Sequence, residues 1–214
     1  MNNEALLYPV TDKDTTVVDD YFGTKVTDPY RWLENDTSAQ TKAWVEAENK
    51  VTFDYLKAIP FREKIRTRLN EVFNYQRYGS PLRAGAYYFF SKNDGLQNQS
   101  VIYYQKGLEG APEVFLDPNT LSKDGTTRAG LAGFSKDKKY TALTTNPAGG
   151  DWQEMDVIEV ATKKKLTDHL KWLKFTGAAW YGNGFFYSRY DEPKKGQELS
   201  GQNQFQKVYY HALG

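Results

Sequence analysis

The feature that most constrains the fold is a series of short β-favouring runs that begins near Tyr75 and continues to the end of the chain. Each run is rich in aromatic and β-branched residues, and Gly, Asn, Asp or Pro separates it from the next. The expected strands cover residues 80–85, 86–92, 100–106, 113–116, 131–135, 140–146, 152–160, 165–170, 177–180, 185–190 and 207–213. Aromatic residues make up 15% of the sequence, which favours large packed strand faces.

These runs recur with a period. Around Phe134 and around Trp180, 46 residues apart, a strand ends near an aromatic residue, a polar turn follows and a second strand begins. The expected third strands contain Ile102, Val157 and Val208, which are 55 and 51 residues apart. Four short strands in every 40–50 residues or so are typical of β-propeller blades. A two-sheet sandwich would give similar strands without this period.

The strand count bears on whether the chain is complete. It gives four, four and then three strands, so the sequence stops before the third blade is finished. Propellers need at least four blades to close, and an unfinished one leaves apolar faces and an open edge. We therefore expect the 214 residues to be the front part of a larger protein. A self-contained, non-catalytic propeller-like or sandwich binding module stays open as the alternative.

Residues 1–74 have a different texture and are expected to be helical. Ser38 is a suitable N-cap for a helix that continues to Ala58, and Pro60 ends it. A second helix is expected over residues 61–73. The residues predicted on one face of the first helix are Trp44, Ala47, Val51 and Tyr55. The sequence thus predicts a mainly β chain with an N-terminal α region, divided into residues 1–74 and 75–214.

Charge and composition exclude several classes of function. Twenty-eight Lys and Arg offset twenty-seven Asp and Glu, so the net charge of +1 indicates neither a nucleic-acid nor a membrane partner. No cysteine is present, which excludes disulfides, thiolate catalysis and cysteine-ligated zinc. With only two histidines, no metal site and no cofactor is expected. No signal peptide or membrane span is visible, and a cytoplasmic or a periplasmic location is left open.

No recognisable catalytic motif occurs in the sequence. A nucleophile elbow requires small residues around the serine, as in G-x-S-x-G, and no serine has that frame. Ser135 comes closest, but Asp137 replaces the closing glycine. Neither His169 nor His211 has a candidate serine partner in a known motif. We therefore expect no catalytic residue within this chain.

Several long strings resemble one peptidase family. YPVTDKD, DYFGTKVTDPYRWLE, GLQNQSVIYYQ and KVYYHALG are similar to the N-terminal part of prolyl oligopeptidases, serine peptidases that cleave short peptides after proline. The resemblance implies that residues 1–74 belong to an α/β-hydrolase peptidase domain. Residues 75–214 would then hold blades one and two and most of blade three of a seven-bladed propeller. The Ser-Asp-His triad of the family would lie beyond this chain.

The resemblance also implies roles for two residues. Phe175, in WLKFTGAAW, is similar to a propeller aromatic that lines an apolar substrate subsite, with blade packing as the alternative. Asp151, in GGDWQ, is similar to an acid at the interdomain contact, with an ordinary turn residue as the alternative. Residues 190–206 correspond to a mobile loop at the domain interface. The implied partners are a proline-containing oligopeptide, the remaining blades and the rest of the hydrolase domain.

Overall fold

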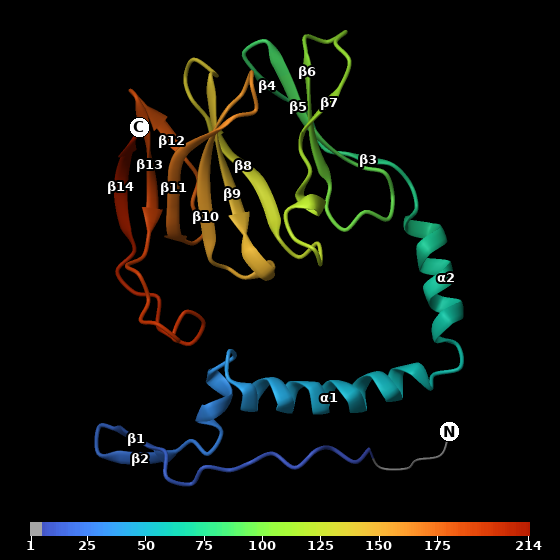
Figure 1. The fold of residues 1–214 in the computed structure, drawn as a ribbon, viewed down its shortest axis with the longest axis vertical. Helices are drawn as coiled ribbons and strands as arrows, with labels where there is room; N and C mark the ends of the chain where they lie inside the picture. The colour runs from blue at the N-terminus through green and yellow to red at the C-terminus, as the bar shows by residue number, and fades with distance from the viewer. Residues whose placement is uncertain (1–5) are drawn as a thin grey trace. The chain divides into compact units, whose positions relative to one another are not determined.

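The computed structural model describes residues 6–214 (Figure 1). The chain folds into two compact units. One extends to Arg68 and includes Pro193–Gln202, and the other comprises Leu69–Glu192 and Asn203–Gly214. The elements up to residue 73 are β1 (Val18–Tyr21), β2 (Thr24–Thr27), the 3-10 helix η1 (Arg31–Glu34), α1 (Ala39–Lys57) and α2 (Arg62–Phe73).

The expectation that the first 74 residues are helical is wrong at residues 18–27, where β1 and β2 form an antiparallel hairpin. Its strands have four residues each and contain charged side chains, so the sequence carries little alternation to reveal them. Side-chain hydrogen bonds of Arg31 link η1 to this hairpin. Its Nε donates to Asp28 Oδ2 at 2.6 Å, and its Nη2 donates to Asp19.

The two predicted helices are present at the expected places. Ser38 Oγ accepts a hydrogen bond from the backbone N–H of Thr41 at 3.1 Å, which fixes the start of α1. Trp44, Ala47 and Val51 on the apolar face of α1 are half-buried, but other apolar side chains of both helices are open to solvent. Tyr55 on α1 is 53% exposed, and Ile65 on α2 is 51% exposed.

Three antiparallel sheets make up the second unit and lie side by side in Figure 1. The first contains β3 (Arg77–Tyr78), β4 (Leu82–Ala84), β5 (Tyr87–Asn93), β6 (Val101–Lys106) and β7 (Glu113–Leu116). The second contains β8 (Arg128–Phe134), β9 (Tyr140–Asn146), β10 (Gln153–Glu159) and β11 (Lys165–Leu173). The third contains β12 (Ala179–Tyr181), β13 (Gly184–Arg189) and β14 (Lys207–Ala212). The predicted series of four, four and three strands is confirmed, with β3 added to the first sheet.

The middle sheet is buried on both faces. Leu143 and Ile158 pack with Phe89 of the first sheet, whereas their neighbours in sequence, Ala142 and Val157, pack with the third sheet. Because successive side chains of a strand point to opposite faces, β9 and β10 are apolar at adjacent positions. The two clusters together form the core of this unit and hold the three sheets in order.

The third sheet has one covered face and one open face. Phe185 and Tyr187 are buried against the middle sheet. The opposite face, here called the outer face of the third sheet, consists of Tyr181, Phe186, Val208 and Tyr210, which are 44–74% exposed. This face is apolar over all three strands.

Because neighbouring strands run in opposite directions, every second connection lies at the same edge of the sheets. This lower edge in Figure 1 carries residues 94–100, 117–127, 147–152 and 174–178. β13 ends and β14 begins there as well. Where β8 of the second sheet approaches the residue before β12, the backbone N–H of Ala178 donates to the carbonyl of Ala132 at 2.9 Å. Gly133 permits this approach, because a Cβ at its φ of +142° would lie 2.6 Å from the carbonyl oxygen of Ala178.

Candidate functional site

Phe175 belongs to the 174–178 connection between β11 and β12, the segment that lies at the lower edge in Figure 1. Its side chain is 82% exposed, and its φ of +50° lies in the left-handed region that non-glycine residues rarely occupy. Hydrogen bonds on both sides hold this conformation. The backbone N–H of Ser188 donates to Thr176 Oγ1 at 2.9 Å, and Gln206 Nε2 donates to the carbonyl of Lys174 at 3.3 Å. The connection therefore presents an aromatic ring to solvent from an anchored backbone.

An aromatic cluster lies beside this connection. The ring of Trp152 meets the rings of Trp172 and Tyr190 edge to face, with centroid distances of 5.5 and 6.1 Å. Lys174 Nζ lies 4.1 Å from the centroid of the Trp152 ring, a cation–π contact. The backbone N–H of Tyr190 donates to the carbonyl of Trp172 at 3.0 Å. These contacts link the 147–152 connection, which precedes β10, to the end of β11 and the 174–178 connection after it.

Asp151 lies in the 147–152 connection and is exposed. Within the described part of the chain its carboxylate forms no ion pair. The backbone around it is ordered by Asn146, whose Nδ2 donates to the carbonyl of Gly150 at 3.0 Å. Asp151 and Phe175 do not touch each other, but their chain neighbours Trp152 and Lys174 do. The structure thus brings both predicted residues to one edge.

The two histidines pair with carboxylates and not with serines. His169 Nδ1 lies 2.6 Å from Asp156 Oδ1, and His211 Nε2 lies 2.7 Å from Asp168 Oδ1. Burial raises the pKa of Asp168, but the hydrogen bonds from His211 and from the backbone N–H of Gly214 outweigh it and hold this pKa below 3.8. In residues 6–214 neither imidazole is bonded to a serine hydroxyl, so these pairs lack a nucleophile.

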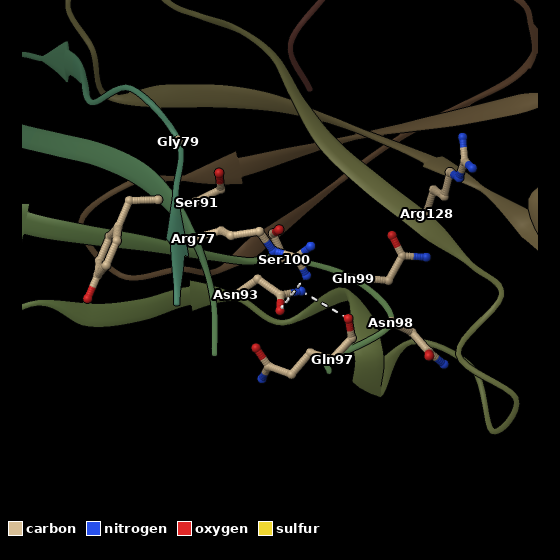
Figure 2. Close-up of a pocket in the computed structure, with 10 residues that line it drawn as sticks. Arg77, Gly79, Ser91, Asn93, Gln97, Asn98, Gln99, Ser100 and Arg128 are labelled. Atoms are coloured by element: carbon tan, nitrogen blue, oxygen red, sulfur yellow. Dashed lines mark hydrogen bonds between the residues drawn. The ribbon is translucent and has the colours of Figure 1, made fainter. Parts of the chain in front are cut away.

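A polar pocket at the same edge was not predicted from the sequence (Figure 2). It has a volume of about 570 Å³ and is lined by two guanidinium groups, four side-chain amides and two serine hydroxyls, with no carboxylate among its lining residues. Asn93 is 3% exposed, and its Nδ2 donates to the carbonyl of Gln97 at 2.9 Å. The run of amides from Gln97 to Gln99 was the available signal, but nothing in the sequence showed that Arg77 and Arg128 would join it.

Two further observations concern the part of the chain that the structure describes. No group of three or more His, Asp or Glu side chains in residues 6–214 is placed to hold a metal ion. In the same part of the chain, no helix has the length and apolar composition to cross a membrane. The groups described at the lower edge are aromatic rings, cations, amides and the carboxylate of Asp151.

Fold and site together define an incomplete β-propeller with recognition groups at one edge. The family model for the N-terminal β-propeller domain of prolyl oligopeptidase matches residues 9–214, and the chain belongs to the prolyl oligopeptidase family. It is 47% identical over its whole length to the prolyl endopeptidase of Elizabethkingia meningoseptica, of which it covers 30%. The prolyl endopeptidase of Dictyostelium discoideum is 35% identical over 97% of the chain, which covers 34% of that relative.

Solved structures agree with this assignment. A chain from a structural study of two prolyl endopeptidases superposes with a TM-score of 0.80 and 30% identity, over 97% of this chain and 31% of that one. Prolyl oligopeptidase B of Galerina marginata, bound to a 25mer macrocyclization substrate, gives a TM-score of 0.74 at 28% identity, over 97% and 32% of the two chains. The chain thus spans about a third of the length of the proteins it resembles.

Proposed function

We propose that this chain is the N-terminal part of a serine endopeptidase that hydrolyses short peptides on the C-terminal side of proline. The observation that carries the proposal is the 47% identity to a prolyl endopeptidase over all 214 residues. In the proposal, residues 1–74 belong to the α/β-hydrolase peptidase domain and residues 75–214 to a seven-bladed propeller. The lower edge faces the substrate cavity, and the propeller limits entry to short peptides.

The activity itself would require residues outside this span. The 214-residue chain alone is expected not to hydrolyse a chromogenic peptide containing proline, because its serines lack a nucleophile frame and its histidines lack a serine partner. The assay uses the purified chain at high concentration. Turnover that a serine-directed phosphonate abolishes would contradict the proposal.

In this proposal Phe175 lines the apolar subsite that lies N-terminal to the proline. Its exposure and its anchored backbone support the role, because a rigid aromatic ring offers contact area at low entropic cost. In the longer protein that contains this span, Phe175→Ala should raise KM about 10-fold for substrates with a large residue two positions before the proline. Substrates that lack this residue should be unaffected, and an equal loss for both would indicate a packing role.

Asp151 is proposed to pair with an arginine of the catalytic domain. An exposed carboxylate with no ion pair in the described residues is suited to this contact. Asp151→Asn in the longer protein should weaken the contact without unfolding the propeller. A double-mutant cycle with candidate arginines would measure the coupling, and additivity with every arginine tested would refute the pairing.

A self-contained binding module is the second candidate. The packed core shared by the three sheets favours it, since such a core can support independent folding. It requires a cooperative, monomeric fold of the 214 residues, whereas the first proposal expects association through apolar faces. Sedimentation and a thermal melt of the isolated chain distinguish the two.

A further inference from the structure

The polar pocket in Figure 2 contains two guanidinium groups and no carboxylate, a charge pattern suited to an anionic ligand. Arg77 and Arg128 both line it, and neither forms an ion pair with a carboxylate in residues 6–214. Two cations in one hollow repel each other unless an anion or solvent compensates them. The other lining groups are neutral amides and hydroxyls, which can donate hydrogen bonds but cannot neutralise the arginines.

Arg77 is held in place before any ligand arrives. Its Nη2 donates to Asn93 Oδ1 at 3.1 Å and to the carbonyl of Gly95 at 2.8 Å, and its guanidinium lies 5.5 Å from the centroid of the Tyr75 ring. Asn93 is buried, so this support is rigid. Two of the five N–H donors of Arg77 are used in these bonds, which leaves three for a ligand.

Arg128 is the first residue of β8 and is exposed. Its side chain and that of Gln99 both line the pocket (Figure 2). The backbone of Gln99 is fixed by Asn119, which accepts from its N–H at 2.9 Å and donates to its carbonyl at 3.0 Å. The pocket therefore combines a rigid wall at Arg77 with a second guanidinium free to move toward a ligand.

We propose that this pocket binds the C-terminal carboxylate of an oligopeptide. Guanidinium groups match a carboxylate in a two-bond fork, and amides beside them can bond the adjoining peptide group. A volume of about 570 Å³ accommodates the last residues of a peptide as well as the carboxylate. Residues 97–99, which line the pocket, belong to the 94–100 connection, at the same edge of the sheets as the 174–178 connection. This assignment rests on the proposed peptide-binding function.

Calorimetric titration of the 214-residue chain tests the proposal. The three probes are an acetylated proline-containing hexapeptide without acidic side chains and with a free C-terminus, its C-terminal amide, and the amide with one internal Glu. The free acid should bind about 10-fold more tightly than either amide, since charged hydrogen bonds contribute more than neutral ones. Arg128→Gln should remove this difference. Lys123→Gln, which removes an exposed cation from the 117–127 connection, should preserve it.

Each other outcome overturns the assignment. Equal binding of acid and amide excludes a carboxylate site, and equal binding of the free acid and the Glu-containing amide excludes a site for the C-terminus. Equal losses in the two variants would indicate a general charge effect. Thermal melts confirm that the variants fold. If both simple peptides bind equally, the proposed function survives without this pocket. No binding of any peptide to the 214-residue chain also refutes the pocket assignment, whereas the proposed function is tested by the assays of the longer protein.

Discussion

At the residue scale, the chain keeps a costly conformation where function is proposed. A left-handed backbone costs a non-glycine residue about 1–2 kcal/mol, and Phe175 recovers little by burial because its ring is 82% exposed. The sequence could not reveal this, since a left-handed Phe has no local signature. What the sequence did offer was the resemblance around WLKFTGAAW. Strain held by neighbouring hydrogen bonds is common at ligand-contacting positions.

This conformation gives a direct stability test. Phe175→Gly should be more stable than Phe175→Ala by about 1 kcal/mol, because glycine adopts a positive φ without steric cost. Urea denaturation of the two variants measures the difference. Equal stability, or a more stable alanine variant, would mean that the backbone at residue 175 is not left-handed in solution.

The Asp168–His211 pair predicts a dependence on pH. Because the pKa of Asp168 is held below 3.8 in the folded state, its charge stabilises the fold above that pH, and the contribution is lost as the pH falls through the lowered pKa. Asp168→Asn should therefore be less stable than the parent chain at pH 7, and the gap should narrow below about pH 3.8. Denaturation at both pH values checks this, and a constant gap would contradict it.

At the scale of elements, local sequence signals predicted the strands well, whereas contacts between distant segments could not be predicted. The turn residues and aromatic runs placed every strand from β4 to β14, because alternation and turn chemistry act within a few residues. The β1–β2 hairpin escaped because Val18–Tyr21 contains two aspartates and little apolar periodicity. The polar pocket escaped for another reason. Arg77 and Arg128 belong to different sheets, and their proximity is a property of the fold alone.

The start of α1 is a sequence signal that can be tested by itself. Ser38→Ala removes the acceptor for the N–H of Thr41 and should cost about 1 kcal/mol of stability. Ser38→Asp restores a side-chain acceptor and should recover most of the loss. Chemical denaturation followed by far-UV circular dichroism measures both. A loss of the same size in the Asp variant would assign Ser38 a role other than capping.

At the scale of the whole molecule, apolar surface is the dominant feature. The outer face of the third sheet exposes aromatic and aliphatic side chains that normally lie against a partner. The relatives are about three times longer than this chain, and in the proposed function the remaining segments cover such faces. In the sequence, only the strand count predicted exposed apolar faces, because it indicated an unfinished propeller.

The exposed face predicts self-association of the 214-residue chain. Its sedimentation coefficient should rise with concentration, and Val208→Lys should reduce the rise by placing a charge on the outer face of the third sheet, where Val208 is 74% exposed. Val26→Lys is the matched control, because Val26 lies on β2 and not on this face. A similar effect of both variants would show that net charge, and not this face, governs association.

The order of the sheets along the chain has a consequence for synthesis on the ribosome. Each sheet is built from neighbouring segments, so the first sheet can pair its strands before the second has left the exit tunnel. The middle sheet, however, needs both of its neighbours to bury its two faces. One of its two faces can pack against the first sheet, which is already translated. The other face stays exposed to solvent until Phe185 and Tyr187 of the third sheet have been translated. During that interval a nascent chain exposes an apolar surface that a chaperone can bind.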